Sequence, residues 1–187
     1  MPFIVWLTVL AYDPAMTPDS AASPPMSPRA REIVAAAREL LEAEGSVSMR
    51  RLADRLGIKA PSLYKHLRDK GALEAALISD AFLEAAERFE RATDLYELGA
   101  AYRAFALDNP HLYRLMFEGR LPRERLVPGA EERAAAPVIA AAGGDPDRGR
   151  ALYAFAHGMV ILELGGRFPD GADLDAAWAR GLRAFAT

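Results

Sequence analysis

Apolar side chains recur along most of the chain at the three- and four-residue spacing that places them on one face of an α-helix. Between residues 29 and 45, four apolar positions share such a face: Ile33, Ala37, Leu40 and Leu41. Gly45 follows them and suits the left-handed conformation in which many helices end. No stretch shows the sustained alternation of a half-buried strand between turn signals. The pattern therefore predicts an all-α fold.

Two short helices are predicted after this first one. Ser48 is a good N-cap for a segment over residues 49–56, and Gly57 ends that segment. Pro61 is tolerated only within the first turn of a helix, so a second short helix must begin close to it, within residues 59–67. The sequence thus predicts two helices of about two turns each, joined by a turn that contains glycine.

A longer helix is predicted after the short pair. Asp69 precedes it and is expected to cap its first turn. Its apolar face is made by Ile78, Phe82, Ala85 and Phe89.

Two short helices joined by a glycine-containing turn are typical of the helix-turn-helix, whose second helix enters the major groove of DNA. Similar turns occur in helical bundles, which is the alternative. Because neither short helix is stable alone in water, these apolar residues are expected to pack on the first helix: Leu52, Leu56, Ile58, Leu63 and Leu67. The positions left to face DNA are basic or polar: Arg50, Arg51, Lys59, Ser62, Tyr64, Lys65 and His66.

The first residues of the chain do not fit this helical pattern. Residues 3–12 are apolar but too few to span a bilayer, which needs about 20 such residues. No basic residue precedes position 29, unlike in a signal peptide. Residues 1–27 are therefore interpreted as an extension outside the folded domains, either disordered or preceding a true translation start at Met16 or Met26.

Charge is distributed unevenly. The 187 residues include 23 Lys and Arg against 26 Asp and Glu, a net charge of −3 that gives no overall attraction to phosphate. Residues 28–70, however, hold ten bases and six acids, a net of +4, whereas residues 71–187 hold thirteen bases and eighteen acids, a net of −5. The only lysines lie in the basic segment, at positions 59, 65 and 70, where a compact ammonium suits a phosphate contact. Chance clustering of solvated lysines is the alternative.

Composition and motifs exclude several chemistries. The absence of cysteine rules out a disulfide scaffold, a Cys zinc site, an iron–sulfur centre and a thiol nucleophile. Only three histidines are present, which argues against a histidine-rich metal site. Residues 71–187 contain no Gly-x-Ser-x-Gly, Gly-x-Gly-x-x-Gly, P-loop or His-Glu-x-x-His motif. We expect no metal, no cofactor and no enzymatic activity.

Residues 47–77 resemble the DNA-binding domain of TetR-family (tetracycline-repressor-like) transcriptional regulators. The matching elements are Leu-Ala-x-x-Leu-Gly at residues 52–57, Ser-Leu-Tyr-x-His at residues 62–66 and Lys-x-x-Leu at residues 70–73. Residues 29–45 are similar to the first helix of the family. The resemblance implies a three-helix helix-turn-helix domain over residues 28–70, followed by a larger helical domain for ligand binding and dimerisation over residues 71–187.

The resemblance also implies roles for individual residues. Arg50 falls where the family often contacts a base edge, and an Arg fork can take guanine O6 and N7 together. Tyr64 and His66 match positions that contact backbone phosphates, although Tyr64 could be partly core and His66 could cap its neighbours. Lys70 lies at a helix N-terminus, itself an anion site. The complete set of expected DNA contacts is Ser48, Arg50, Lys59, Ala60, Pro61, Ser62, Tyr64, Lys65, His66 and Lys70.

The C-terminal part resembles the ligand-binding domain of the family. Residues 101–120, with Ala156-His157-Gly158 farther along, are similar to its "WHG" type, except that Ala156 replaces the Trp of that motif. The residues expected to line an apolar pocket are Tyr102, His111, Met116, Tyr153 and His157. An aromatic cluster at helical spacing could equally be plain core, and His157 could be a core or interface histidine.

The last two predicted helices are expected to form a homodimer. Residues 152–164 are apolar almost all around one helix, which indicates burial on more than one side. The expected interface consists of Leu152, Phe155, Met159, Leu162, Trp178, Leu182 and Phe185. The alternative is an ordinary monomer core.

The resemblance implies a cytoplasmic homodimer that represses transcription from a palindromic operator in double-stranded DNA and is released by an unknown small-molecule inducer, with no membrane partner. A transcriptional activator of the same fold is one alternative. A helical small-molecule-binding protein without DNA regulation is the other.

Overall fold

The computed structural model describes residues 26–117 and 119–186, and these contain helices but no strands. The prediction of an all-α fold is confirmed. The extension expected at residues 1–27 lies almost wholly outside the described residues. The helices are α1 (Pro28–Glu44), α2 (Met49–Arg55), α3 (Ala60–Leu63), α4 (Lys70–Phe89), α5 (Leu95–Asp108), α6 (Pro110–Phe117), the 3-10 helix η1 (Arg123–Arg125), α7 (Ala130–Ala141), α8 (Pro146–Leu164) and α9 (Leu174–Arg183).

The described chain divides into two compact units. The N-terminal unit comprises residues 26–81 and, from farther along the chain, residues 109–130 apart from residue 118. The C-terminal unit comprises residues 82–108 and 131–186. Helix α4 contributes its first part to one unit and its last part to the other, and α6 belongs with α1 to α3 in the N-terminal unit.

Helix boundaries in the N-terminal unit follow from the predicted caps. Gly45 ends α1 with φ at 71°, and its N–H donates to the Leu41 carbonyl. The Ser48 hydroxyl accepts from the Arg51 N–H at the start of α2. Asp69 Oδ1 accepts from the Ala72 N–H at 2.7 Å in the first turn of α4. All three predicted caps are confirmed.

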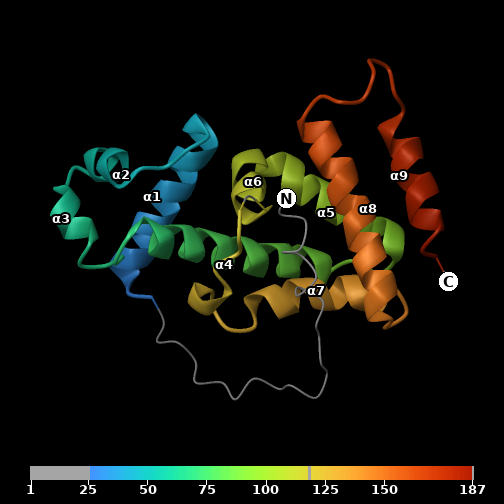
Figure 1. Cartoon of the computed structure of the whole chain (residues 1–187), viewed down its shortest axis with the longest axis horizontal. Helices are drawn as coiled ribbons and strands as arrows, with labels where there is room; N and C mark the ends of the chain where they lie inside the picture. Colours follow the sequence, from blue (N-terminus) through green and yellow to red (C-terminus); the bar gives the residue numbers. More distant parts are fainter. Residues whose placement is uncertain (1–25, 118, 187) are drawn as a thin grey trace. The chain divides into compact units, whose positions relative to one another are not determined.

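The core of this unit is apolar, as the pattern predicted. Figure 1 shows α2 and α3 beside α1. Residues 56–59 join α2 to α3. The predicted face of α1 is fully buried: Ile33, Ala37, Leu40 and Leu41. Leu52, Leu63 and Leu67 are also buried, whereas Leu56 and Ile58 are only half-buried.

The second short helix is shorter than predicted. α3 covers one turn, Ala60–Leu63, and residues 64–67 continue as turns rather than α-helix. Lys59 at its start supplies no side-chain cap. The carbonyl of Leu63 accepts from the N–H groups of both His66 and Leu67, which tightens the chain after one turn. A two-turn helix at residues 59–67 was thus wrong in length.

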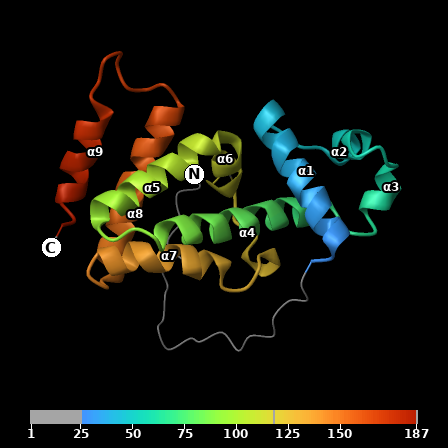
Figure 2. The ribbon, with the colours of Figure 1, turned by 180° about the vertical axis from the view of Figure 1, so that it is seen from behind.

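The C-terminal unit is built around three mutually packed helices, α5, α8 and α9. Figure 2 shows α8 and α9 side by side, joined by the segment over residues 165–173. The buried residues of α8 are Gly149, Leu152, Ala156 and Val160, and those of α9 are Trp178 and Leu182. Gly181 permits the close approach, because a Cβ there would lie 2.1 Å from the Phe155 ring.

Among the described residues, no helix is both long and apolar enough to cross a membrane.

Candidate nucleic-acid interface and the C-terminal aromatic cluster

The expected DNA contacts form an accessible surface on α2, α3 and the residues after each. Ser48, Arg50, Lys59, Pro61, Lys65, His66 and Lys70 are exposed, and Ala60 and Ser62 are half-buried. Tyr64 is 50% exposed, which disfavours the core position considered for it. The structure thus brings together, on one short segment, the side chains that the resemblance assigned to DNA.

Three cations among the expected DNA contacts carry no ion-pair partner among the described residues: Arg50, Lys59 and Lys65. Neighbouring arginines differ, because Arg51 pairs with Glu44 at 2.5 Å and Arg55 donates to Glu39 at 2.5 Å. Those two pairs link α2 to α1, and as exposed pairs they contribute little stability. The arginines on α2 thus differ: Arg51 and Arg55 are neutralised by glutamates of α1, whereas the charge of Arg50 is not.

Lys70 is exposed, but its surroundings differ from the anion site that was expected. Its ammonium lies 3.0 Å from Glu74 Oε1. The N-terminus of α4 is already occupied by Asp69, which accepts from the Ala72 N–H and also from Arg125 at 2.9 Å. The backbone hydrogen bond from Ala72, and then the Arg125 guanidinium, lower the pKa of Asp69. The helix end is thus satisfied by a carboxylate, and Lys70 itself remains the group that could meet a phosphate.

Sequence reasoning missed the residues that tie α6 to α1. The Glu42 carboxylate accepts from the backbone N–H groups of His111 at 3.2 Å and Leu112 at 2.7 Å, which caps α6 from another helix. One turn earlier, Arg38 donates to Asn109 Oδ1 at 2.7 Å. These partners are 69 to 71 residues apart in the chain, so no local pattern signals them. These hydrogen bonds hold α1 to the start of α6.

Two of the expected ligand-binding residues lie in the N-terminal unit. The His111 imidazole approaches Gly45, where a Cβ would lie 3.1 Å from its Cε1 atom. His111 also lines a surface hollow of about 400 Å³ together with Lys70, Glu74 and Arg114. Met116 is buried in α6.

The other three expected ligand-binding residues meet in the C-terminal unit. Tyr102 on α5 stacks on Phe89 with ring centroids 5.6 Å apart, and it meets the edge of Tyr153 at 6.2 Å. Tyr153 in turn stacks on His157, one turn along α8, at 5.8 Å. Burial is the main cause that raises the pKa of the Tyr153 phenol well above 10, so this hydroxyl stays neutral.

Burial also lowers the pKa of His157 below its ordinary value of 6.5. The unfolded chain then takes up a proton near pH 6.5 while the folded chain stays neutral, so folding stability is lost as the pH falls below about 6.5. We expect His157→Gln to reduce this loss. Urea unfolding at pH 7.5 and pH 5 measures the change in folding stability with pH. An equal fall in stability for wild type and variant would contradict a role of His157 in this loss.

The residues expected at a dimer interface differ in how far their side chains are exposed in the single protomer. Leu152, Trp178 and Leu182 are buried within the protomer itself. Phe155, Met159 and Phe185 are half-buried, and Phe155 contacts both Trp178 at 5.6 Å and Phe185 at 6.1 Å. Leu162 is 43% exposed, as is its neighbour Ile161 at 39%.

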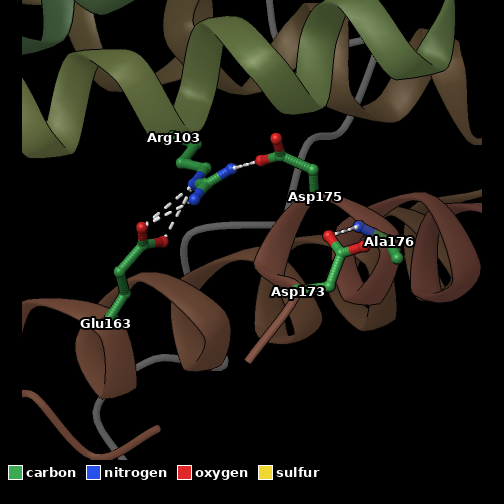
Figure 3. Close-up of polar contacts among 5 residues, drawn as sticks. All are labelled: Arg103, Glu163, Asp173, Asp175 and Ala176. Carbon is green, nitrogen blue, oxygen red and sulfur yellow. Dashed lines mark hydrogen bonds and ion pairs between the residues drawn. The ribbon is translucent and has the colours of Figure 1, made fainter. Parts of the chain in front are cut away.

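An arginine joins the three helices of the C-terminal unit and was missed in the sequence. Arg103 on α5 donates from Nε to Glu163 Oε2 at 2.9 Å and from Nη2 to Glu163 Oε1 at 2.7 Å (Figure 3). Its Nη1 atom donates to Asp175 Oδ1 at 2.5 Å. These hydrogen bonds, with Glu163 first, raise the pKa of Arg103, so it carries a full positive charge. A single guanidinium thereby ties α5 to both α8 and α9.

An exposed, partly unpaired basic surface on a short helix pair, braced from behind by buried leucines, defines a DNA-binding protein of the helix-turn-helix class. Two profiles of known families match the chain. One, described as bacterial regulatory proteins of the tetR family, matches residues 33–77. The other, described as the tetracyclin repressor-like C-terminal domain, matches residues 95–185.

Individual relatives agree with these profiles. An uncharacterized HTH-type transcriptional regulator of Mycobacterium tuberculosis is 33% identical over 166 residues, which cover 78% of this chain and 74% of that protein. A protein of unknown function from Rhodococcus sp. RHA1 is 27% identical and superposes with a TM-score of 0.69, covering 84% of this chain and 95% of that one. A TetR variant from Acinetobacter baumannii AYE, solved in complex with minocycline, is 26% identical with a TM-score of 0.59, covering 82% and 91%.

The chain belongs to the TetR family of bacterial transcriptional regulators. The resemblance read from residues 47–77 is confirmed, as is the prediction that the protein is a DNA-binding regulator and not an enzyme. The narrower "WHG" similarity of the C-terminal part stays a prediction.

Proposed function

We propose that this protein is a homodimeric transcriptional repressor that binds a palindromic operator through α2 and α3 and releases it when a small molecule binds the C-terminal unit. The observation that carries the DNA-binding half is a set of exposed cations, Arg50, Lys59 and Lys65, that have no ion-pair partner in the part of the chain that the structure describes. Arg50 is proposed to contact a base edge, and Lys59 and Lys65 to face the groove. Tyr64, His66 and Lys70 are proposed to contact phosphates.

The proposed dimer pairs α8 and α9 with their copies. Support comes from the adjacent exposed side chains of Ile161 and Leu162 on α8. Gly158 lies on the same helix, and the space beside it is open, since a Cβ added there would meet no atom within 4 Å. A two-fold dimer would place two recognition helices about 34–36 Å apart, the spacing of successive major grooves. Because Leu152, Trp178 and Leu182 are buried within the protomer, we propose that they support the interface from behind.

Release by a ligand follows from linkage. A ligand that binds a dimer with wrongly spaced recognition helices weakens DNA binding, and DNA weakens ligand binding by the same factor. Support for a ligand site comes from the aromatic cluster of Tyr102, Tyr153 and His157 and from the minocycline complex of the Acinetobacter relative.

Two substitutions separate a base contact from a phosphate contact. Arg50→Ala is expected to weaken operator binding by about 1–3 kcal/mol and to relax selectivity at one position of the site. Lys70→Ala is expected to weaken binding to all sequences and to reduce its salt dependence. Gel-shift titrations against the operator and single-base variants measure both effects. Equal sequence selectivity in the two variants would contradict these roles.

The test of the whole proposal is operator selection from random DNA with the full-length protein, followed by transcription from a promoter that carries the selected site. A symmetric site, and lower transcription when the protein is present, are expected. An asymmetric site would contradict the dimer, higher transcription would favour an activator, and no enriched site would contradict sequence-specific binding.

A further inference from the structure

Arg125 brings a positive charge to the start of α4 from far along the chain. Its Nη1 atom donates to Asp69 Oδ1 at 2.9 Å, across 56 residues of sequence. A Cβ at Gly71 would lie 2.8 Å from the same Nη1 atom and 3.2 Å from Asp69 Oδ1. The guanidinium therefore lies directly against the first turn of α4, in space that the absence of a side chain at position 71 leaves open.

The segment that carries Arg125 is fixed to α4 within the N-terminal unit. Leu121, before η1, is buried. After η1, the Val127 N–H donates to the Ser79 hydroxyl at 3.0 Å, and this hydroxyl donates to the Ala75 carbonyl at 2.8 Å. Ser79 is only 1% exposed, so these hydrogen bonds are shielded from water. Arg125 is thus held beside α4 by a well-anchored segment.

The charges around Arg125 are mostly positive. Asp69 is the one acidic residue between positions 55 and 73, and exposed cations flank it on both sides, Arg68 and Lys70. Lys70 pairs with Glu74, whereas Arg68 has no ion-pair partner among the residues that the structure describes.

The segment around η1 adds to this excess. Residues 120–125 hold three arginines and one glutamate. Arg120 and Glu124 line the same hollow as Gly71 and Arg125, and they contribute one charge of each sign. The start of α4 and the η1 segment therefore form a single basic surface.

A DNA backbone is the partner that fits this surface. Lys70, next to Asp69 in the chain, is already proposed to contact a phosphate. Each strand of duplex DNA carries one phosphate for about every 3.4 Å of helix axis, so a backbone that reaches Lys70 brings neighbouring phosphates close to Arg125. The Arg125 side chain is 46% exposed, and a guanidinium has several N–H groups with which to bind phosphate oxygens as well as a carboxylate.

We propose that Arg125 is a further contact to the DNA backbone, held in position by Asp69, so that the DNA-binding surface includes the η1 segment as well as the helix-turn-helix. The inference rests on the DNA-binding half of the proposed function and needs neither the dimer nor the ligand. Backbone contacts carry no sequence information, so Arg125 raises the affinity for an operator and for unrelated DNA alike.

The first test is Arg125→Gln in the full-length protein. Fluorescence anisotropy measures binding to a duplex with the selected operator and to an unrelated duplex, between about 50 and 200 mM salt. At the lowest salt, affinity for both duplexes is expected to fall about three- to tenfold, and the slope of log K against log salt to fall by about 0.9 for each protomer bound. Arg125→Lys should keep most of the affinity, because it keeps the charge.

Arg91→Gln is the matched control, because Arg91 is an exposed arginine of the C-terminal unit. It removes the same charge and is expected to leave the salt dependence unchanged. Since an exposed ion pair adds little to stability, the Tm of Arg125→Gln should equal that of wild type. A wild-type slope in Arg125→Gln, or an equal loss in Arg91→Gln, would overturn the contact.

The second test, Gly71→Ala, displaces the guanidinium without changing the charge of the protein. The added methyl takes the place of Nη1, and the flexible end of the arginine moves away. Alanine favours a helix over glycine, so Tm should be unchanged or higher, while the salt slope falls as in Arg125→Gln.

In the Arg125→Gln background, Gly71→Ala is expected to change DNA affinity no further. A full loss of affinity in that background would show that the methyl acts on DNA binding by itself, and a wild-type slope in Gly71→Ala alone would show that the position of the guanidinium is irrelevant. Either result would overturn the inference.

These measurements separate the inference from the proposed function. If no operator can be selected, sequence-specific binding fails, yet the unrelated duplex still measures the backbone contact of Arg125. If an operator is selected and Arg125→Gln binds it with the wild-type slope, the proposed function stands and only the role of Arg125 fails.

Discussion

Leu63→Ala is expected to destabilise the N-terminal unit by about 2–5 kcal/mol and to abolish specific DNA binding. Leu63 is completely buried and is the only buried side chain of α3. A helix of four residues has no stability of its own, so its position depends on what Leu63 contacts. Urea unfolding with gel-shift assays on the selected operator measures both losses.

Leu63→Met and Tyr64→Ala serve as its controls. A volume-conserving change such as Leu63→Met should cost less than about 1.5 kcal/mol. Tyr64 is 50% exposed, so Tyr64→Ala should leave stability nearly unchanged while it weakens DNA binding. If Leu63→Ala unfolded like wild type and still selected the same operator, α3 would not depend on this contact.

Trp178→Ala is expected to cost about 3–5 kcal/mol of stability in the C-terminal unit. Trp178 is 5% exposed and packs edge-on against Phe155, with ring centroids 5.6 Å apart. Its loss would leave a cavity between α8 and α9, the two helices proposed to form the dimer. Thermal unfolding measures the stability, and sedimentation velocity over a range of concentrations measures dimerisation.

Trp178→Phe is the informative comparison, because the Trp178 Nε1 atom is buried without a hydrogen-bond partner among the described residues. Phe removes that unpartnered donor, whose burial is itself unfavourable, while it keeps most of the apolar ring. We expect no more than about half the loss seen with Ala. If Trp178→Ala instead left the protomer stable and changed only the dissociation of the dimer, Trp178 would be an interface residue and not protomer core.

The N-terminal unit was largely predictable because its signals are local. Ser48, Asp69 and Gly45 each act within a few residues of their own position, as caps that end or begin a helix. The leucines at helical spacing then determine which faces turn inward. The length of α3 was overestimated because the spacing of apolar residues predicts which face of a helix is buried, but not the residue at which the helix ends.

The five expected ligand-binding residues fall in two different units, because nearness in the sequence does not decide which helix a residue packs against. His111 and Met116 follow Tyr102 closely in the chain, yet they belong with α1 in the N-terminal unit, where Glu42 caps α6. Tyr102 instead meets Tyr153, far along the chain. The spacing of apolar residues in an amphipathic helix predicts that they are buried, but not which other helix they pack against.

By itself the sequence determined the helical class, the position of the helix-turn-helix, its basic charge and the family, since each depends on residue type at short spacing. Only the tertiary structure decided which cations have no ion-pair partner among the described residues, that Arg103 joins α5 to Glu163 and Asp175, and that Leu182 fills the space beside Gly99. The contacts of Arg103 and Leu182 join residues 60 to 83 positions apart in the chain. Packing of whole helices, rather than any local preference, brings such residues together.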